Sequence, residues 1–293
     1  MRAPRLAAAL LAACTLLASC GQVNEGPEPS PILWEITGED GRHGYLFGTI
    51  HALPDGVEWR TDAFDAAFDR SDALLVEADL LGSETPVSEV FGRLATSPGL
   101  PPLELRVSPE AREALRKVMA DKGIDASQFA QVESWAAALT IAQAYQVGDA
   151  ENGADLALLR DAGARRVVEL EGVERQLGLF DALPEEEQAD LLEAVIGEIS
   201  GHDPQARSGE LRTAWLTGDA AAFIALARSG MLADPELREA LLVGRNREWA
   251  RRIEAELAAG ARPFVAVGAA HVIGEDGLAA MLERRGYTLT RIQ

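Results

Sequence analysis

Two copies of one short pattern, each placed after an apolar run, are the features of this sequence most able to do chemistry. An apolar run that ends at Phe47 leads into Gly-Thr-Ile-His51, and a run that ends at Val267 leads into Gly-Ala-Ala-His271. Glycine permits a tight turn where a strand ends, so each imidazole is expected at the rim of a sheet and not inside the core. We therefore predict that His51 and His271 are functional residues.

Two carboxylates follow the same logic. Glu77 comes directly after the apolar residues 73–76, and Glu171 comes directly after residues 166–170. Two neutral imidazoles and a carboxylate suit Zn, Mn, Fe or Co, and such an ion lowers the pKa of a bound water. Without a metal, the same residues would supply a histidine general base and a carboxylate that orients it. The residues leave both chemistries open.

Short apolar runs alternate with longer helical stretches, which indicates an α/β fold. A mixed, mostly parallel central sheet is expected, with helices packed around it and a helical insertion between the two Gly-x-x-His motifs. The predicted strands are residues 32–36, 45–50, 73–77, 166–170, 263–267 and 287–292. The first two should form an antiparallel hairpin, and the runs 166–170 and 263–267 resemble strands that are buried on both faces. Asp-Pro235-Glu predicts the start of a helix that continues to about Ala259.

The composition is globular and acidic. The chain has 293 residues, 47% of them hydrophobic, and 27 Lys and Arg against 47 Asp and Glu give a net charge of -20. A surface of this charge repels polyanions, so no nucleic-acid partner is expected. Residues 32–293 contain no linker or low-complexity run, which favours a single domain.

The first twenty residues resemble a lipoprotein leader. Arg2 and Arg5 precede an apolar run over residues 6–18, which is too short for the ~20 residues of a membrane-spanning helix. Leu-Ala-Ser-Cys20-Gly resembles a lipobox, so we expect cleavage after residue 19, a lipid on Cys20 and a tether over residues 20–31. The mature protein would then be anchored by lipid in the cell envelope, facing the periplasm or the exterior, and the absence of Asp at position 21 is compatible with sorting to the outer membrane. An ordinary signal peptide with a chance cysteine is the alternative.

The chain resembles the TraB/GumN family, which includes the Tiki proteins, within a wider grouping of erythromycin esterases and a haem-binding lipoprotein. The resemblance covers most of residues 32–293. Its carriers are Leu46–His51 with Leu53 and Pro54, Leu75–Glu77, Ser134–Ala136, Asn152–Asp155, Leu170 and Glu171 with Gln176, Arg245 and Asn246, Val267–Leu278, and Arg285–Tyr287.

The resemblance implies a hydrolytic, divalent-metal-dependent site formed by His51, His271 and Glu77. The esterase relatives use a histidine, an arginine nine residues later and a glutamate, and here His51, Arg60 and Glu77 match that pattern. Arg60 is thus a candidate for anion stabilisation. Arg245 precedes the last motif and is expected to pair with a site glutamate or to hold a substrate carboxylate.

The leading hypothesis is a lipid-anchored hydrolase, specifically a peptidase-like enzyme dependent on Mn, Co or Zn and acting on a peptide or small molecule. His51, His271 and Glu77 would hold the metal, Glu77 or Glu171 would act as general base, and Arg60 or Arg245 would stabilise the oxyanion. One alternative is a binding protein for haem, a metal or a secreted peptide without turnover. Another is an interaction scaffold in which both histidines are structural.

Overall fold

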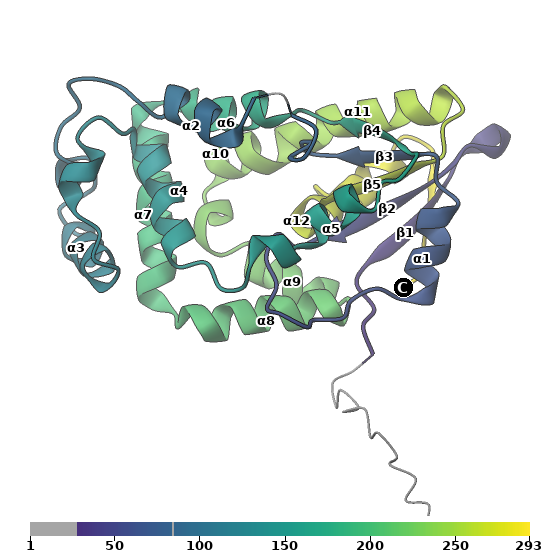
Figure 1. Ribbon diagram of the computed structural model, residues 1–293, viewed down its shortest axis with the longest axis horizontal. Helices are drawn as coiled ribbons and strands as arrows, with labels where there is room; N and C mark the ends of the chain where they lie inside the picture. Colours follow the sequence, from purple (N-terminus) through teal and green to yellow (C-terminus); the bar gives the residue numbers. More distant parts are fainter. Residues whose placement is uncertain (1–27, 84) are drawn as a thin grey trace, which may run out of the picture.

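A central sheet of six strands organises the protein, and the computed structural model describes residues 28–83 and 85–293 (Figure 1). Every strand predicted from the sequence is present, with ends that differ by at most two residues. The strands are β1 (Leu33–Thr37), β2 (His43–Thr49), β3 (Ala73–Val76), β4 (Arg166–Glu169), β5 (Pro263–Gly268) and β6 (Thr288–Arg291). Their order across the sheet is β4-β3-β5-β2-β1-β6.

The sheet is mixed and mostly parallel, as predicted. Strands β4, β3, β5 and β2 run parallel, whereas β1 pairs antiparallel with β2 through the expected hairpin and with β6 on its other side. The register aligns the carboxyl ends of the parallel strands, because Thr49 lies opposite Gly268, and Val76 lies opposite both Ala266 and Glu169. Residues that follow these four strands therefore meet at one edge of the sheet.

Burial differs between the two strands that were predicted to be covered on both faces. Every residue of β5 is buried, in agreement with the prediction. The prediction was wrong for β4, whose end residues Arg166 and Glu169 are exposed and whose two valines are only half-buried. The physical reason is position, since β4 is an edge strand with β3 as its one neighbour.

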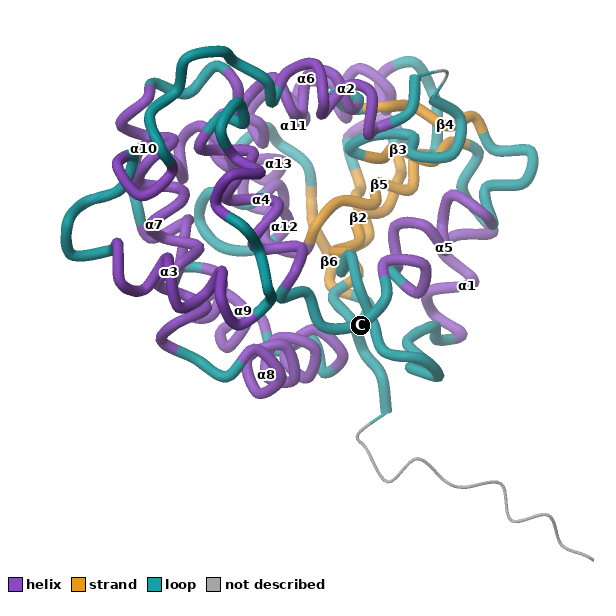
Figure 2. The backbone as a smooth tube through the Cα atoms, turned by 60° about the vertical axis from the view of Figure 1, so that its left-hand side comes forward, coloured by secondary structure: helices purple, strands orange, loops and turns teal. Residues whose placement is uncertain are grey.

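Helices from several parts of the chain cover the sheet (Figures 1 and 2). They are α1 (Asp62–Asp69), α5 (Ala154–Arg160), α11 (Gly244–Ala258), the short α12 (Ala269–Val272) and α13 (Leu278–Glu283). Thr61 caps α1 by accepting a hydrogen bond from the Phe64 amide. The Phe64 ring then packs edge-on against Phe47 and Phe264, with centroids 4.9 and 5.3 Å away, so α1 closes the core over β2 and β5.

The predicted helical insertion forms a second apolar cluster beside the sheet. The cluster is built from α2 (Val87–Leu94), α3 (Arg112–Asp121), α4 (Ser134–Ala144), α6 (Val173–Asp181) and α7 (Glu185–Gly201). The insertion also contains α8 (Pro204–Leu216) and α9 (Ala220–Ala227), whose buried residues pack with the core of the sheet. Helices α4 and α7 lie side by side at a distance from the strands in Figure 1, and α8 and α9 run below them. The Trp215 indole of α8 donates a 2.7 Å hydrogen bond to the Gly48 carbonyl, which fixes the insertion to β2 at the first motif.

The helix predicted from Pro235 to Ala259 is present but is not regular. It begins as α10 (Pro235–Arg238), passes through a π-helical turn over Glu239–Val243, and continues as α11. A π-helical turn widens the helix and is frequent at functional sites.

The predictions for the leader and for Cys20 lie outside the described residues, as does most of the expected tether. None of the helices within residues 28–83 and 85–293 combines the length and the hydrophobicity that a bilayer crossing requires.

Candidate active site

The four predicted strand-end residues meet at the carboxyl edge of the sheet, where they follow β4, β3, β5 and β2 in spatial order. They are Glu171, Glu77, His271 and His51. The glycines of the two motifs act differently from the prediction. Neither Gly48 nor Gly268 has positive φ, and both lie within strands. Gly48 is required by close approach, because a Cβ there would lie 3.0 Å from the Ala269 Cα.

His51 is held by a carboxylate from helix α5. Its Nδ1 lies 2.8 Å from Oδ2 of Asp155, and the Thr49 hydroxyl donates to the other carboxylate oxygen. The start of α5 lies directly against the chain at His51, because the Ala154 amide donates to the Ile50 carbonyl at 2.9 Å. Gly153 allows this approach, since a Cβ there would lie 2.3 Å from the His51 carbonyl oxygen.

The electrostatic environment favours a positive charge on His51. Attraction to the Asp155 carboxylate, reinforced by their hydrogen bond, raises the pKa of His51 to about 9, against opposition from desolvation and from Arg245. The side chain is nevertheless 73% exposed, whereas Asp155 is 19% exposed. His51 is therefore an accessible imidazole whose Nδ1 is oriented by an inner carboxylate and whose Nε2 is free to meet a ligand.

Glu77 is a buried, ionised carboxylate. Its Oε1 accepts a 2.9 Å hydrogen bond from the Gly268 amide, and its Oε2 accepts from Arg245 at 2.7 Å and from Gln176 at 3.1 Å. Burial alone would raise the pKa of Glu77, but the positive charges of Arg245 and His51 and the Gly268 amide outweigh it, so the pKa is lowered.

His271 is buried and neutral. Burial lowers its pKa to about 3. Its Nδ1 lies 2.7 Å from Oδ1 of Asn246, so Nδ1 is the protonated nitrogen because an amide oxygen can only accept. Its Nε2 lies 3.2 Å from Nη1 of Arg245, and a guanidinium can only donate, which assigns the same tautomer independently.

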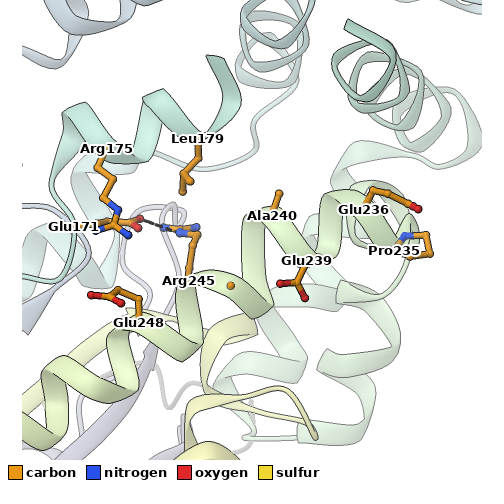
Figure 3. Close-up of a pocket in the computed structure, with 10 residues that line it drawn as sticks. Glu171, Arg175, Leu179, Pro235, Glu236, Glu239, Ala240, Arg245 and Glu248 are labelled. Atoms are coloured by element: carbon orange, nitrogen blue, oxygen red, sulfur yellow. Dashed lines mark hydrogen bonds and ion pairs between the residues drawn. The ribbon is translucent and has the colours of Figure 1, made fainter. Parts of the chain in front are cut away.

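Arg245 joins the buried acids and His271 from the first turn of α11. Beyond its contacts with Glu77 and His271, its Nε donates to Oε1 of Glu171 at 2.9 Å. The guanidinium also stacks 4.6 Å from the ring centroid of Trp249. Figure 3 shows Arg245 and Glu171 pointing toward each other on the wall of a pocket of about 600 Å³. Burial raises the pKa of Glu171.

The centre of the group is the space above Gly268. A Cβ on Gly268 would lie 3.3 Å from Oε1 of Glu77, 3.5 Å from Nε2 of His51 and 3.8 Å from Cδ2 of His271. This convergence brings the three predicted metal ligands together. Two of the predicted metal-ligating atoms, Nε2 of His51 and Oε1 of Glu77, face this space.

The third predicted ligand does not fit a metal in this arrangement. The Nε2 lone pair of His271 accepts from Arg245, which also occupies Oε2 of Glu77. Among the residues described here, no three His, Cys, Asp or Glu side chains are arranged to hold a metal ion. Arg245 provides the positive charge between His271 and Glu77, so a three-ligand site would require its guanidinium to move.

Arg60 is the one predicted site residue that the structure does not bring to this group. Its Nε donates to Asp65 at 2.8 Å, its Nη1 pairs with Asp161 at the far end of α5, and the guanidinium lies 5.1 Å from the Phe64 ring centroid. It ties α1 to α5 instead.

Sequence reasoning missed the roles of three polar residues that orient the group. Asp155 orients His51, Asn246 orients His271, and Gln176 contacts Glu77. The available signal was their presence in the short segments that carry the family resemblance, since neither periodicity nor strand-end position distinguishes them.

A large apolar cleft opens beside the group. It has a volume of about 660 Å³, within the usual range for small-molecule sites. His51, His271 and Arg245 lie on its wall at the sheet, and helices α4, α7, α8 and α9 and the π-helical turn supply most of the remainder. Arg245 thus lies between this cleft and the pocket of Figure 3, since it lines both.

These observations define the class of protein. It is an α/β protein with paired strand-end histidines, a buried glutamate and a buried arginine. The TraB/PrgY/gumN family model matches residues 32–291, and the chain belongs to that family. It is 30% identical over 258 residues to the uncharacterized protein YbaP of Shigella flexneri and to YbaP of Escherichia coli K12, covering 85% of this chain and 90% of each relative. An uncharacterized protein of Treponema pallidum is 27% identical over 225 residues, which cover 71% of this chain and 65% of that protein. No solved structure matches the chain significantly.

Proposed function

We propose that this protein is a cell-envelope hydrolase that splits a carbonyl–heteroatom bond, with His51 as its general base. One observation carries the proposal. His51 is oriented through Nδ1 by the inner Asp155 carboxylate, while its Nε2 faces Glu77 and the space above Gly268 at the wall of an apolar cleft. A histidine held in one tautomer by a carboxylate is a common arrangement for proton transfer to and from a reacting group.

The reaction would begin with proton transfer from water to His51. Nε2 takes the proton, the resulting hydroxide adds to the substrate carbonyl carbon, and the proton then passes from Nε2 to the leaving heteroatom as its bond to carbon breaks. Asp155 stabilises the imidazolium that forms between these steps. Glu77 is ionised and faces the same space, where its Oε1 would orient the water by accepting a hydrogen bond.

Arg245 is the permanent cation of the site. Its N–H groups already donate to the two buried acids, to His271 and to the Leu241 carbonyl, so its charge offsets those carboxylates and would act on the carbonyl oxygen, which gains negative charge as hydroxide adds, only from a distance. His271 accepts from Arg245 through Nε2 and is fixed by Asn246 on its other side, so it acts as a positioning residue for the guanidinium. Because the observed arrangement leaves no third metal ligand, none of these steps passes through a metal.

Attachment to a membrane through a lipid on Cys20 belongs to the same proposal. The chain would then act at the surface of the cell envelope, on a peptide or small molecule that reaches the cleft. The support is the lipobox-like sequence that precedes the tether.

Hydrolysis measured on His51 variants tests the function. We expect protein that begins at Gly21 to hydrolyse activated esters and anilides. Above pH 9, where His51 of the wild type is unprotonated, His51→Gln and Asp155→Asn should lower kcat/KM by about 100-fold or more. His43→Gln is the matched control, because His43 pairs with Glu35 at the β1–β2 hairpin, away from the cleft. Equal activity in wild type and His51→Gln would overturn the proposal.

A further inference from the structure

The apolar cleft beside His51 is larger and more uniform than proton transfer requires. Its apolar lining includes the side chains of Val195, Ile199, Leu211, Leu226 and Leu242, which belong to four different helical segments. Charged and ionisable side chains also line it. His51 and Arg245 are at the sheet, and Glu198, His202 and Arg207 lie where α7 leads into α8. This lining favours an occupant with an apolar body and a polar end that reaches His51.

The helical walls discriminate against an extended peptide. Most residues around the cleft belong to helices, whose amides and carbonyls are already paired within each helix. A peptide strand bound there would bury its own amides and carbonyls without partners, which is unfavourable for each group. The strands that lead to the cleft, β2 and β5, end just before lining residues Ile50 and Ala270, and both are interior to the sheet and offer no free edge for strand addition.

A helical peptide pairs its own backbone, so the backbone argument does not separate it from a hydrocarbon chain. A hydrocarbon chain has no backbone groups to satisfy, is narrow, and gains binding free energy from each methylene that leaves water.

We infer that the cleft between the sheet and helices α4, α7, α8 and α9 binds a linear acyl chain, and that the substrate is an acyl ester whose carbonyl lies at His51. The hydrolysis of the ester rests on the proposed function, whereas the binding of the acyl chain rests on the cleft alone. Hydrolysis would add water across the ester bond, so the carbonyl carbon gains the hydroxyl, the alcohol oxygen gains the proton, and a fatty acid and an alcohol are released.

Binding and turnover can be tested separately with probes of increasing length. Protein beginning at Gly21 retains every described residue of the fold. In the His51→Gln variant, calorimetric titration with saturated fatty acids of four to fourteen carbons should show the Kd falling about threefold to fourfold for each added methylene until the cleft is full. In wild type, the KM for p-nitrophenyl esters should fall over the same range of lengths.

Variants that fill the cleft test its location. Ala142→Trp on α4 and Ala227→Trp on α9 place an indole into the cleft from two different helices and should weaken dodecanoate binding at least tenfold. Ala120→Trp on the exposed face of α3, outside the cleft, is the matched control and should bind like wild type. Thermal melting of all three variants identifies any loss of binding that is caused by unfolding.

The outcomes distinguish the inference from the function on which it rests. Affinity that is independent of chain length, or an apolar hexapeptide that binds more tightly than dodecanoate, would overturn the acyl site. Length-dependent binding without turnover of any ester by wild type would support the acyl site and contradict the hydrolase. Turnover of short and long esters with equal KM would support the hydrolase and contradict the acyl site.

Discussion

Oδ2 of Asp155 lies 2.8 Å from Nδ1 of His51, although the two residues are 104 positions apart in the chain. The contact joins the end of a central strand to the first turn of α5. It exists because the Ala154 amide reaches the Ile50 carbonyl across a residue, Gly153, that has no side chain to obstruct it. This pairing controls the charge of the one accessible imidazole in the group.

Removal of the Asp155 charge should lower the pKa of His51. Attraction to this carboxylate is the largest cause of the raised value of about 9, so Asp155→Asn should return the pKa toward the ordinary 6.5. The pH titration of the His51 ring protons by NMR measures this shift. Thr49→Val, which removes a neutral partner of Asp155, is the control and should leave the pKa of His51 well above 6.5. An unchanged pKa in Asp155→Asn would show that another group holds the proton.

Hydrolysis should be an alkaline activity. A general base must be unprotonated, and with a pKa of about 9 roughly one His51 in a hundred is neutral at pH 7. We expect kcat/KM to rise about tenfold per pH unit below the pKa and to level off above it. The residual activity of Asp155→Asn should level off at a lower pH. A rate that falls with rising pH through this range would assign His51 the role of acid instead.

Most of the sheet could be predicted because its signals are local. Each strand is a short apolar run between turn residues, and the hairpin at residues 38–44 follows from the spacing of its two strands. The position of β4 was not predictable in the same way. Whether a strand lies at the edge or in the centre of the sheet depends on the strand order. An apolar run such as Val167-Val168 is found in edge strands and in central strands alike.

The site could be predicted only in part, for a related reason. His51, His271, Glu77 and Glu171 each follow a strand, so the parallel register brings them together. Asp155 and Arg245 arrive on helices, and no local pattern states which helical side chain faces the sheet edge. Arg245 was expected to pair with a site glutamate, as it does, but Asp155 was given no role. The metal hypothesis assumed that His271 and Glu77 have no other cationic partner at this edge of the sheet. The guanidinium of Arg245 occupies that position.

Loss of Arg245 should destabilise the fold strongly. Its side chain is 10% exposed and pairs with Glu77 and Glu171, which are 11% and 2% exposed. Arg245→Met leaves both carboxylates buried without their cation, at a cost of about 3–5 kcal/mol in the free energy of unfolding. Arg247→Met on the same helix is the control, because Arg247 is 51% exposed and its ion pair with Glu239 is worth less than about 1 kcal/mol. Urea unfolding measures both, and equal costs would show that the buried network contributes no special stability.

Removal of the Arg245 side chain should strengthen metal binding, although it weakens the fold. Arg245→Ala frees Nε2 of His271 and Oε2 of Glu77, so we expect Zn²⁺ or Co²⁺ to bind about 10- to 100-fold more tightly than in wild type. Calorimetry measures the affinity, and elemental mass spectrometry after purification without chelators measures the content. Near-stoichiometric Mn, Co or Zn in wild type that disappears in the His51→Ala, His271→Ala double variant would instead show that Arg245 moves aside for a metal.

Substitution of Gly268 should lower activity, whereas substitution of Gly48 should lower stability. Gly268→Ala adds a methyl group 3.3 Å from Glu77 and 3.5 Å from His51, in contact with side-chain atoms of the site and not with backbone. We expect kcat/KM to fall at least tenfold, because the methyl group occupies the space proposed for water, while the free energy of unfolding changes by less than about 1 kcal/mol. Gly48→Ala adds its methyl group 3.0 Å from the Ala269 Cα, so α12 must shift and stability should fall by about 1–3 kcal/mol. Ester hydrolysis and urea unfolding of both variants check the contrast. Full activity in a stably folded Gly268→Ala would place the reacting water elsewhere.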